Sequence, residues 1–189
     1  MKKLFFSVIF LFALGSSTTY GQTVTIGLRF ERFESFAYFV NYTQKSSGVQ
    51  FMPIPLSSDY LKAGVLIYDK FEIELKGGLQ LGDLFVGGEY AIIFKYNIVK
   101  NVFPLVTYLN HFNVGDLGMG HGTYGDRMDF IGIGAEGKLT KLFTLDLTFY
   151  IPIGKKNLEF EVGSFDEKIT TAKIGPMIKL GFIFNIIRF

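Results

Sequence analysis

The chain has 189 residues, of which 19 are Lys or Arg, 17 are Asp or Glu, and none is Cys. The absence of Cys excludes a disulfide framework and a lipid-anchored cysteine, and the nearly balanced charge provides no basic footprint for nucleic acid. Mean hydropathy is +0.31 and 17% of the residues are aromatic, which is unusually apolar for a water-soluble domain.

The N-terminal residues are typical of a secretory signal peptide. Lys2 and Lys3 precede an apolar run from Leu4 to Leu14, and small or polar residues follow. This run is shorter than the roughly 20 apolar residues that a spanning helix needs. We therefore predict that residues 1–21 are cleaved and that residues 22–189 form one domain. Both lysines leave with the signal, so the mature domain is predicted to have no net charge.

Eight segments of the predicted domain alternate apolar and polar residues, and no apolar run after Leu14 is long enough for a spanning helix. In chain order these segments are 24–31, 61–67, 71–81, 89–97, 103–112, 131–136, 143–151 and 172–186. Alternation with a period of two indicates strands with one face toward lipid and one toward a polar interior. The register of the fifth segment is ambiguous. Because an open sheet edge in hydrocarbon would leave backbone groups unpaired, we predict an all-β fold, an eight-stranded antiparallel up-and-down transmembrane β-barrel.

The connections between the segments fall into two classes. Three are short, at 69–70, 98–101 and 139–142, and are predicted to be periplasmic, on the same side as both termini. Of the outer connections, the second is short, whereas the first, third and fourth are long and keep strand character. The first and fourth have tips at 45–48 and 163–166. Strands one, two, seven and eight are therefore predicted to run about 20 residues each, or about 65 Å, although about 9–11 residues cross a membrane.

These four long strands become neighbours when the barrel closes, so their excess length predicts an extracellular wall on one side. A change of parity near Gly154 predicts a bulge in strand seven. The first hairpin of the wall contains six large residues, namely Phe36, Tyr38, Phe39, Tyr42, Phe51 and Met52. They either pack within the wall or contact lipopolysaccharide acyl chains at the rim, or they form a patch that binds a protein. An exposed sheet edge of the wall could also accept a partner strand.

Most charged residues of the predicted strands fall on inward parities. The main set is Arg29, Glu72, Glu74, Lys76, Glu89, Glu136, Asp146 and Lys179, and the same parities hold Glu31, Lys62, Lys95 and Lys173. These charges form either an ion path or a network of pairs that fills the lumen. An eight-stranded barrel is just wide enough for its own side chains, and buried charges persist when they are paired. Since the two signs nearly balance, we predict a plugged lumen, in which inward glycines make room for long side chains.

The last strand ends in a motif that resembles an assembly signal. Lys179, Gly181, Phe184 and Ile186 follow the order polar, glycine, aromatic and hydrophobic, and Phe189 lies three residues beyond. The motif and the alternating strands resemble the OmpA/OmpX-type small outer-membrane barrel family, and the wall resembles the protruding sheet of its OmpX branch. The resemblance implies the outer membrane of a Gram-negative-type bacterium and recognition by the barrel-assembly machinery. Either the strand slips by one register at its end, or Phe189 supplies the terminal aromatic residue.

The two histidines do not complete an enzymatic or metal site. His111 is followed two residues later by Asn113, where the barrel class of lipid A deacylases has a serine nucleophile. His121, with Asp116 and Asp126, lacks the ligand spacing of known metal sites. We therefore predict no catalytic residue, no metal and no cofactor, and we place His111 at the membrane rim.

Together these features predict a structural or interaction protein of the outer membrane and not an enzyme. Its expected partners are outer-membrane lipid and lipopolysaccharide, the assembly machinery during insertion, and a protein or surface partner at the wall, but no nucleic acid. The alternatives are an accessory subunit of a larger envelope complex, a narrow porin-like pore for small solutes or ions, and a lipid-modifying barrel enzyme.

Overall fold

Antiparallel strands make up most of the chain that the computed structural model describes, which comprises residues 22–41, 49–82, 86–99, 101–115, 127–154, 157–161 and 169–188. In chain order the strands are β1 (Gln22–Asn41), β2 (Val49–Ile67), β3 (Phe71–Gly82), β4 (Val86–Tyr96), β5 (Val102–Gly115), β6 (Arg127–Lys138), β7 (Phe143–Ile153), β8 (Asn157–Glu161) and β9 (Ile169–Arg188). Within these residues, no helix is long and apolar enough to cross a membrane.

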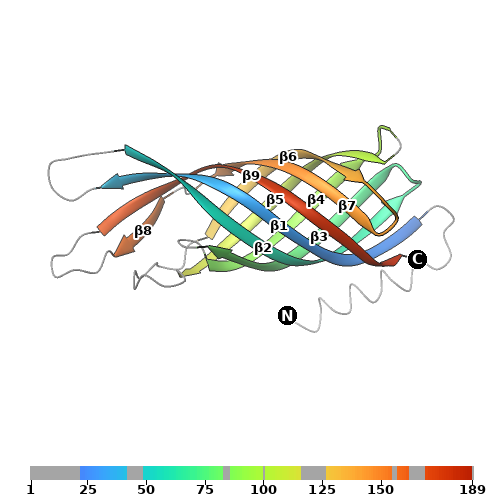
Figure 1. Ribbon diagram of the computed structural model, residues 1–189, viewed down its shortest axis with the longest axis horizontal. Helices are drawn as coiled ribbons and strands as arrows, with labels where there is room; N and C mark the ends of the chain where they lie inside the picture. Colours follow the sequence, from blue (N-terminus) through green and yellow to red (C-terminus); the bar gives the residue numbers. More distant parts are fainter. Residues whose placement is uncertain are drawn as a thin grey trace.

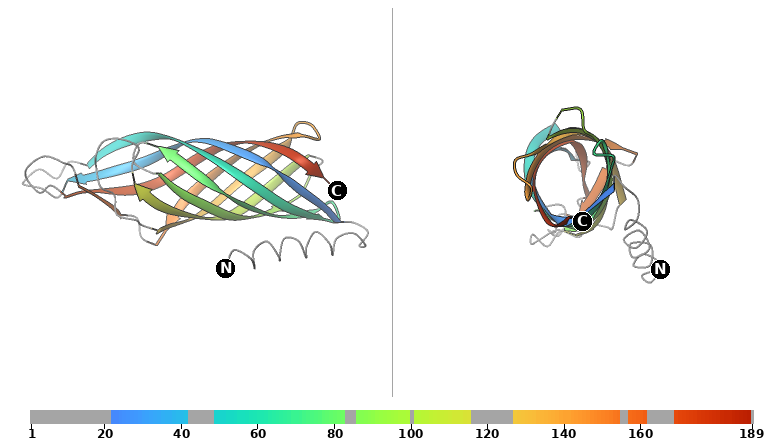
Figure 2. Two further views of the ribbon diagram at one scale, coloured as in Figure 1. Left: turned by 90° about the horizontal axis from the view of Figure 1, so that it is seen from below. Right: turned by 90° about the vertical axis from the view of Figure 1, so that its right-hand side faces the viewer.

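The strands close into a ring (Figure 1). Each strand from β1 to β7 pairs with the next, β7 pairs with β9, and β9 pairs with β1. The end-on view in Figure 2 shows the closed ring. Eight strands therefore form the antiparallel up-and-down barrel that the sequence predicts, and β8 is an additional short strand paired with β9. We call the end where β1 begins and β9 ends the near end, and the opposite end the far end.

Burial alternates along the strands of the barrel wall. In β4 every second residue from Gly87 to Lys95 is buried, and most residues between them are exposed. Most of the exposed residues on the wall are apolar, for example Leu75, Ile92, Val106, Ile133, Leu147 and Leu180. Such an exterior is unfavourable in water but suits lipid, where a closed strand ladder also pairs the backbone groups. The wall therefore has the exterior of membrane-spanning strands.

The β2–β3 connection is a two-residue hairpin turn. Tyr68 and Asp69 have φ angles of 51° and 53°, and the N–H of Lys70 donates to the carbonyl of Ile67 at 3.1 Å. Two consecutive positive φ angles indicate a type I′ turn, whose twist matches that of paired strands. The short connection predicted from the sequence is present, with its centre shifted by one residue.

Three strands are much longer than the others. β1, β2 and β9 have 20, 19 and 20 residues, whereas β3 to β7 have 11 to 14. Pairing of β1 with β2 continues to Val40 and Val49, but pairing of β2 with β3 stops at Leu56 and Gly82. The long strands consequently project past the rest of the ring at the far end (Figure 1).

Strand seven differs from the sequence prediction, because the structure has β7 followed by a separate β8 in place of one long bulged strand. Pairing of β7 with β9 ends at Tyr150 and Met177, next to Pro152 and Pro176. Proline has no backbone N–H, so the two prolines interrupt the ladder at this point. Gly154, with a φ of +79°, then lets the chain turn before β8 resumes pairing with β9 in a shifted register.

The seam between β1 and β9 contains a one-residue slip near the end of β9. Ile26 is paired with Ile187, but the next residue, Gly27, is paired with Asn185, so Ile186 is an extra residue. Ile186 and Ile187 are both exposed, at 54% and 46%. The structure thus has the slip of register that the sequence leaves as one of two alternatives.

Candidate functional site

The barrel interior has a charged side and an apolar side. The buried ionisable residues of the charged side form what we call the interior ion network, which comprises Arg29, Glu31, Lys62, Glu72, Glu74, Lys76, Glu89, Lys95, Glu136, Asp146 and Lys179. The alternation of β3 explains much of this concentration, because Glu72, Glu74 and Lys76 occupy every second position and face inward together. The network contains six acidic and five basic residues, so burial of the charges is nearly balanced.

Arg29 is the centre of the interior ion network. Its Nε lies 2.7 Å from Glu31, its Nη1 lies 3.1 Å from Glu74, and its Nη2 lies 2.5 Å from Asp146. The planar guanidinium suits this role because its donors point in several fixed directions. Glu74 is on β3 and Asp146 is on β7, and these strands lie opposite each other in the ring of eight. One side chain on β1 therefore joins opposite walls of the lumen.

Toward the near end, Lys95 is the second cation that binds several acids. Its Nζ lies 2.6 Å from Glu136, 2.7 Å from Glu74 and 3.3 Å from Glu72. The Nζ of Lys62 on β2 also binds Glu74, at 2.9 Å from its Oε2. Glu74 thus links Arg29, Lys62 and Lys95, and losing it would leave three buried cations with fewer partners.

Toward the far end, Lys179 and Tyr60 connect two further acids. The Nζ of Lys179 lies 3.3 Å from Glu31 and 3.0 Å from Glu89, and it donates to the Tyr60 hydroxyl at 3.2 Å. The Tyr60 hydroxyl in turn donates to Glu89, and Lys76 pairs with Glu31. These contacts join β9 to β1, β2 and β4 through side chains. Ion pairs between walls are the geometry of a filled lumen rather than an open one.

Two inward glycines make room for neighbouring side chains. A Cβ added to Gly181 would collide with the Asp146 carboxylate, and one added to Gly132 would lie 2.6 Å from Thr107 Cγ2 and 2.8 Å from Tyr150 Cδ1. Gly181 also belongs to the motif that resembles an assembly signal. Space for the Asp146 carboxylate is a second, separate reason for a glycine at this position.

The apolar side of the interior is built by β4, β5 and β6. Its buried residues are Ala91, Ile93, Phe103, Leu105, Leu109, Met128 and Phe130. The inward Leu105 and Leu109 are as apolar as the outward Val106 and Phe112, which explains why the register of β5 is ambiguous in the sequence. Because each face of β5 mixes apolar and polar residues, no clear hydropathy contrast distinguishes its inward face, and sequence reasoning missed the apolar residues of this side.

The structure places His111 inside the barrel, not at the membrane rim as predicted from the sequence. The odd-numbered residues of β5 face inward, so His111 and Asn113 are both buried. His111 Nδ1 lies 3.3 Å from Glu89 Oε1, but neither ring nitrogen forms a hydrogen bond with the described residues. An acyl-transfer site would need a nucleophile next to this histidine, and the corresponding residue is an amide.

A metal site is not formed by the residues that the structure describes, which contain no group of three or more potential His, Cys, Asp or Glu ligands. His121, Asp116 and Asp126, which the sequence analysis weighed as ligands, lie outside the described residues.

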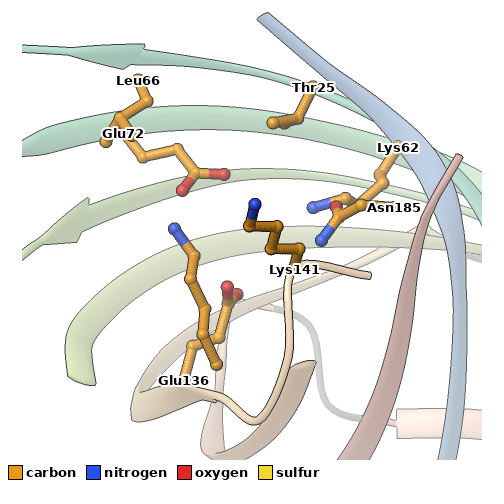
Figure 3. A pocket seen from close by; sticks show the side chains of 8 residues that line it. Thr25, Lys62, Leu66, Glu72, Glu136, Lys141 and Asn185 are labelled. Carbon is orange, nitrogen blue, oxygen red and sulfur yellow. The ribbon is translucent and has the colours of Figure 1, made fainter. Parts of the chain in front are cut away.

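A small pocket opens at the near end of the interior ion network (Figure 3). Its lining residues are Thr25, Lys62, Leu66, Glu72, Glu136, Lys138, Lys141 and Asn185. Lys141 extends from the turn between β6 and β7 into the space beside Glu72 and Glu136 (Figure 3), and Lys138 lies over the ring of Phe103 at 4.0 Å. The mouth of the barrel thus combines both signs of charge.

Five of the six residues of the predicted extracellular patch lie on the long strands β1 and β2. Tyr38 on β1 is paired with Phe51 on β2, and Phe36 with Pro53, whereas Phe39 and Met52 occupy the alternate positions. Register therefore divides these positions between the two faces of the sheet. The side chains of this region and all of Tyr42 lie outside what the structure describes.

The residues of the assembly-like motif divide between the two faces of β9. Lys179 and Gly181 face the interior, and Phe184 and Ile186 are exposed on the outside. Phe184 packs edge-to-face against Phe143 on β7, with ring centroids 5.7 Å apart. Phe189 lies outside the described residues, and the side chain of Lys173, an inward position in the sequence prediction, is likewise not described.

Solved structures of small outer-membrane barrels are similar to this chain. The outer membrane protein OprG from Pseudomonas aeruginosa is 13% identical over 89% of this chain and 96% of its own, with a TM-score of 0.48. The N-terminal β-barrel domain of Pseudomonas aeruginosa OprF is 15% identical, over 84% and 97%, with a TM-score of 0.42. Neisserial surface protein A is 12% identical, over 84% and 97%, with a TM-score of 0.44. No family model and no curated protein matches the sequence. At such low identity a shared barrel concerns the fold and not the activity.

Proposed function

We propose that the protein is an outer-membrane β-barrel of the structural or interaction type, which binds a protein or surface partner through β1, β2, β8 and β9. The observation that supports this best is that Arg29 joins opposite walls of the lumen, while the long strands extend beyond the rest of the ring. In this proposal the far end is extracellular, the near end is periplasmic, and residues 1–21 are a cleaved signal peptide. The role requires no catalytic residue, metal or cofactor.

The two edges of the projecting sheet differ in their ability to accept a partner strand. Residues 49–55 of β2 pair only with β1 among the described residues, and this segment contains Pro53 and Pro55. Prolines on an edge strand place their missing N–H on the unpaired side, which weakens any further ladder there. β8 has no proline and pairs on one side with β9. A partner strand would therefore be added beside β8, by the pairing mode in which main-chain hydrogen bonds provide affinity.

Site-specific photo-cross-linking in living cells tests this proposal. A photo-reactive residue replaces Glu159 on β8, and matched controls replace Ile54 on the proline-containing edge and Ile133 on the lipid-facing wall. We expect a discrete protein adduct at position 159 and little or none at the two controls. Equal adducts at positions 159 and 133 would contradict the proposal. An adduct with another integral outer-membrane protein would identify the chain as a subunit of an envelope complex.

The alternative of a narrow pore is disfavoured because the paired side chains of the interior ion network cross the lumen. Steady conductance in a planar bilayer that changes in Glu74→Gln or Lys76→Gln would show that the network lines an ion path. We expect instead that the wild-type protein and both variants show no steady conductance.

A further inference from the structure

One part of the barrel exterior departs from the apolar pattern of the wall. On the outside of β4, β5 and β6, at their far ends, five polar residues lie together: Tyr90, Tyr108, Asn110, Arg127 and Asp129. We call them the outer polar cluster. They occupy outward positions by strand parity, because the residues that alternate with them, including Glu89, Leu109 and Met128, are buried inside the barrel, although Asn110 is itself covered by its neighbours and only 2% exposed. The cluster is therefore separate from the interior ion network.

Asp129 is held within the cluster by two donors from β5. The Tyr108 hydroxyl donates to Asp129 Oδ1 at 2.5 Å, and Asn110 Nδ2 donates to the same oxygen at 2.6 Å. Asn110 lies directly opposite Asp129 in the β5–β6 register, so this contact follows from strand pairing. Asp129 is fixed and remains 34% exposed, which makes it a rigid support for a neighbouring cation.

That cation is Arg127. Its Nη2 donates to the Tyr90 hydroxyl at 2.8 Å, and its Nε lies 3.8 Å from Asp129 Oδ1. The side chain is nevertheless 59% exposed. A guanidinium has five N–H donors in a planar fork; Tyr90 accepts from one of them, and Tyr108 is a second hydrogen-bond partner. Arg127 is thus oriented by the cluster while more than half of its side chain stays exposed.

The height of the cluster places it at a membrane boundary. Asp129 is nine positions before Lys138, the last residue of β6, which corresponds to about 30 Å along the strand or about 23 Å along the barrel axis at a tilt near 40°. The apolar band of such barrels is about 25 Å tall. Exposed apolar residues, including Ile131 and Ile133, fill the outside of β6 below the cluster. The charges therefore lie where the lipid headgroups begin, a depth at which a charge on the wall costs little.

We propose that the outer polar cluster binds a phosphorylated headgroup of an outer-leaflet glycolipid, of the lipid A class, with Arg127 as the phosphate ligand. Arginine pairs with phosphate through charge-assisted and often bidentate hydrogen bonds, and tyrosines such as Tyr90 and Tyr108 suit the boundary between acyl chains and headgroups. A lipid is favoured over a protein because the exposed side chains beside the cluster, such as Phe112 and Ile131, belong to the lipid-facing wall. β5 also lies opposite β1 in the ring, so the cluster is on the side away from the projecting sheet.

Titration of the full folded protein in detergent micelles with bis-phosphorylated lipid A tests this proposal, with dephosphorylated lipid A in parallel and calorimetry as the measurement. We expect phosphate to improve binding about tenfold and Arg127→Gln to abolish most of that gain, because one charge-assisted pair contributes roughly the free energy of a tenfold change. Tyr90→Phe keeps the ring but removes the acceptor that orients Arg127, so it should have a smaller effect in the same direction.

Arg32→Gln is the matched control. Arg32 is also an exposed arginine on the outside of the barrel, with 58% of its side chain accessible and Asp59 at 3.5 Å, but it has no tyrosine contact among the described residues. We expect it to bind like the wild type. Equal loss in Arg32→Gln and Arg127→Gln, or no preference for phosphate in the wild type, would overturn the proposal. Unchanged lipid A binding by a folded Arg127→Gln variant that loses a co-purifying protein would overturn it as well, and would assign the cluster to a protein interface. Heat-dependent gel mobility confirms that each variant is folded.

Discussion

The charged and apolar sides of the barrel interior fill one lumen by different physical means. On the charged side, Arg29 and Asp146 meet in a directed contact that requires one particular partner. On the apolar side, Ile93, Leu109 and Phe130 are buried by packing that depends on volume and not on direction. In a small barrel, directed ion pairs on one side of the lumen can thus determine which walls meet, while apolar side chains on the other side fill the remaining space. The two sides should therefore tolerate different substitutions: the charged side needs the same donor geometry, and the apolar side needs the same volume.

The largest effect is expected for Arg29→Met. It leaves Glu31, Glu74 and Asp146 without their shared cation, which should lower the free energy of unfolding by about 3–5 kcal/mol. Arg29→Lys should restore only part of this loss, because an ammonium cannot reproduce the guanidinium fork. Urea unfolding in lipid vesicles measures both. The exposed Arg32→Met is the control, with a cost below about 1 kcal/mol, and equal costs at the two arginines would contradict the special role of the interior ion network.

On the apolar side, Leu109→Ala should lower the free energy of unfolding by about 3 kcal/mol, through lost burial and the cavity that remains. Leu109→Met conserves volume and should cost less than about 1.5 kcal/mol. The same urea unfolding assay measures both. A large cost for Leu109→Met would mean that shape, and not volume alone, is fixed on this side, and the contrast with Arg29 would then disappear.

A smaller effect is expected where a glycine makes room for the charged side. Gly181→Ala displaces the Asp146 carboxylate and should cost about 1–3 kcal/mol. Combined with Asp146→Ala, the added methyl group should cost less, since the group that it displaces is gone. Gly137→Ala is the control, because nothing lies within 4 Å of its added Cβ. Additive costs in the double variant would show that Gly181 is needed for a reason other than Asp146.

Alternation along the sequence predicts the barrel well because each strand of the charged side shows a strong contrast between its faces. β3 alternates Glu72 and Glu74 with Ile73 and Leu75, so only one register is possible. β5 gives no such contrast, since both its inward and its outward residues include apolar and polar side chains. The misplacement of His111 follows directly, because its position depends on that register.

Individual contacts between strands could not be predicted from parity. Parity places Arg29 and Asp146 inside the barrel, but their contact depends on the stagger of strands that are far apart in the chain. The outer polar cluster was missed because the predicted sixth strand begins after Asp129. The break in strand seven had a visible signal in Pro152 and Pro176, but these residues lie on different strands and come together only where the pairing of β7 with β9 ends.

Closure of the barrel and pairing of its charges are one event. Arg29 on β1 is 117 positions from Asp146, and Lys179 on β9 is 119 positions from Tyr60. Until β9 meets β1, Arg29 and Glu31 lack their partners on the last strands, and hydrocarbon strongly disfavours unpaired charges. A half-assembled sheet with β1 at its edge is therefore expected to stay in water or on the assembly machinery, and entry into lipid is coupled to formation of the seam. The interior ion network is therefore expected to favour insertion of the closed ring over insertion of an open sheet.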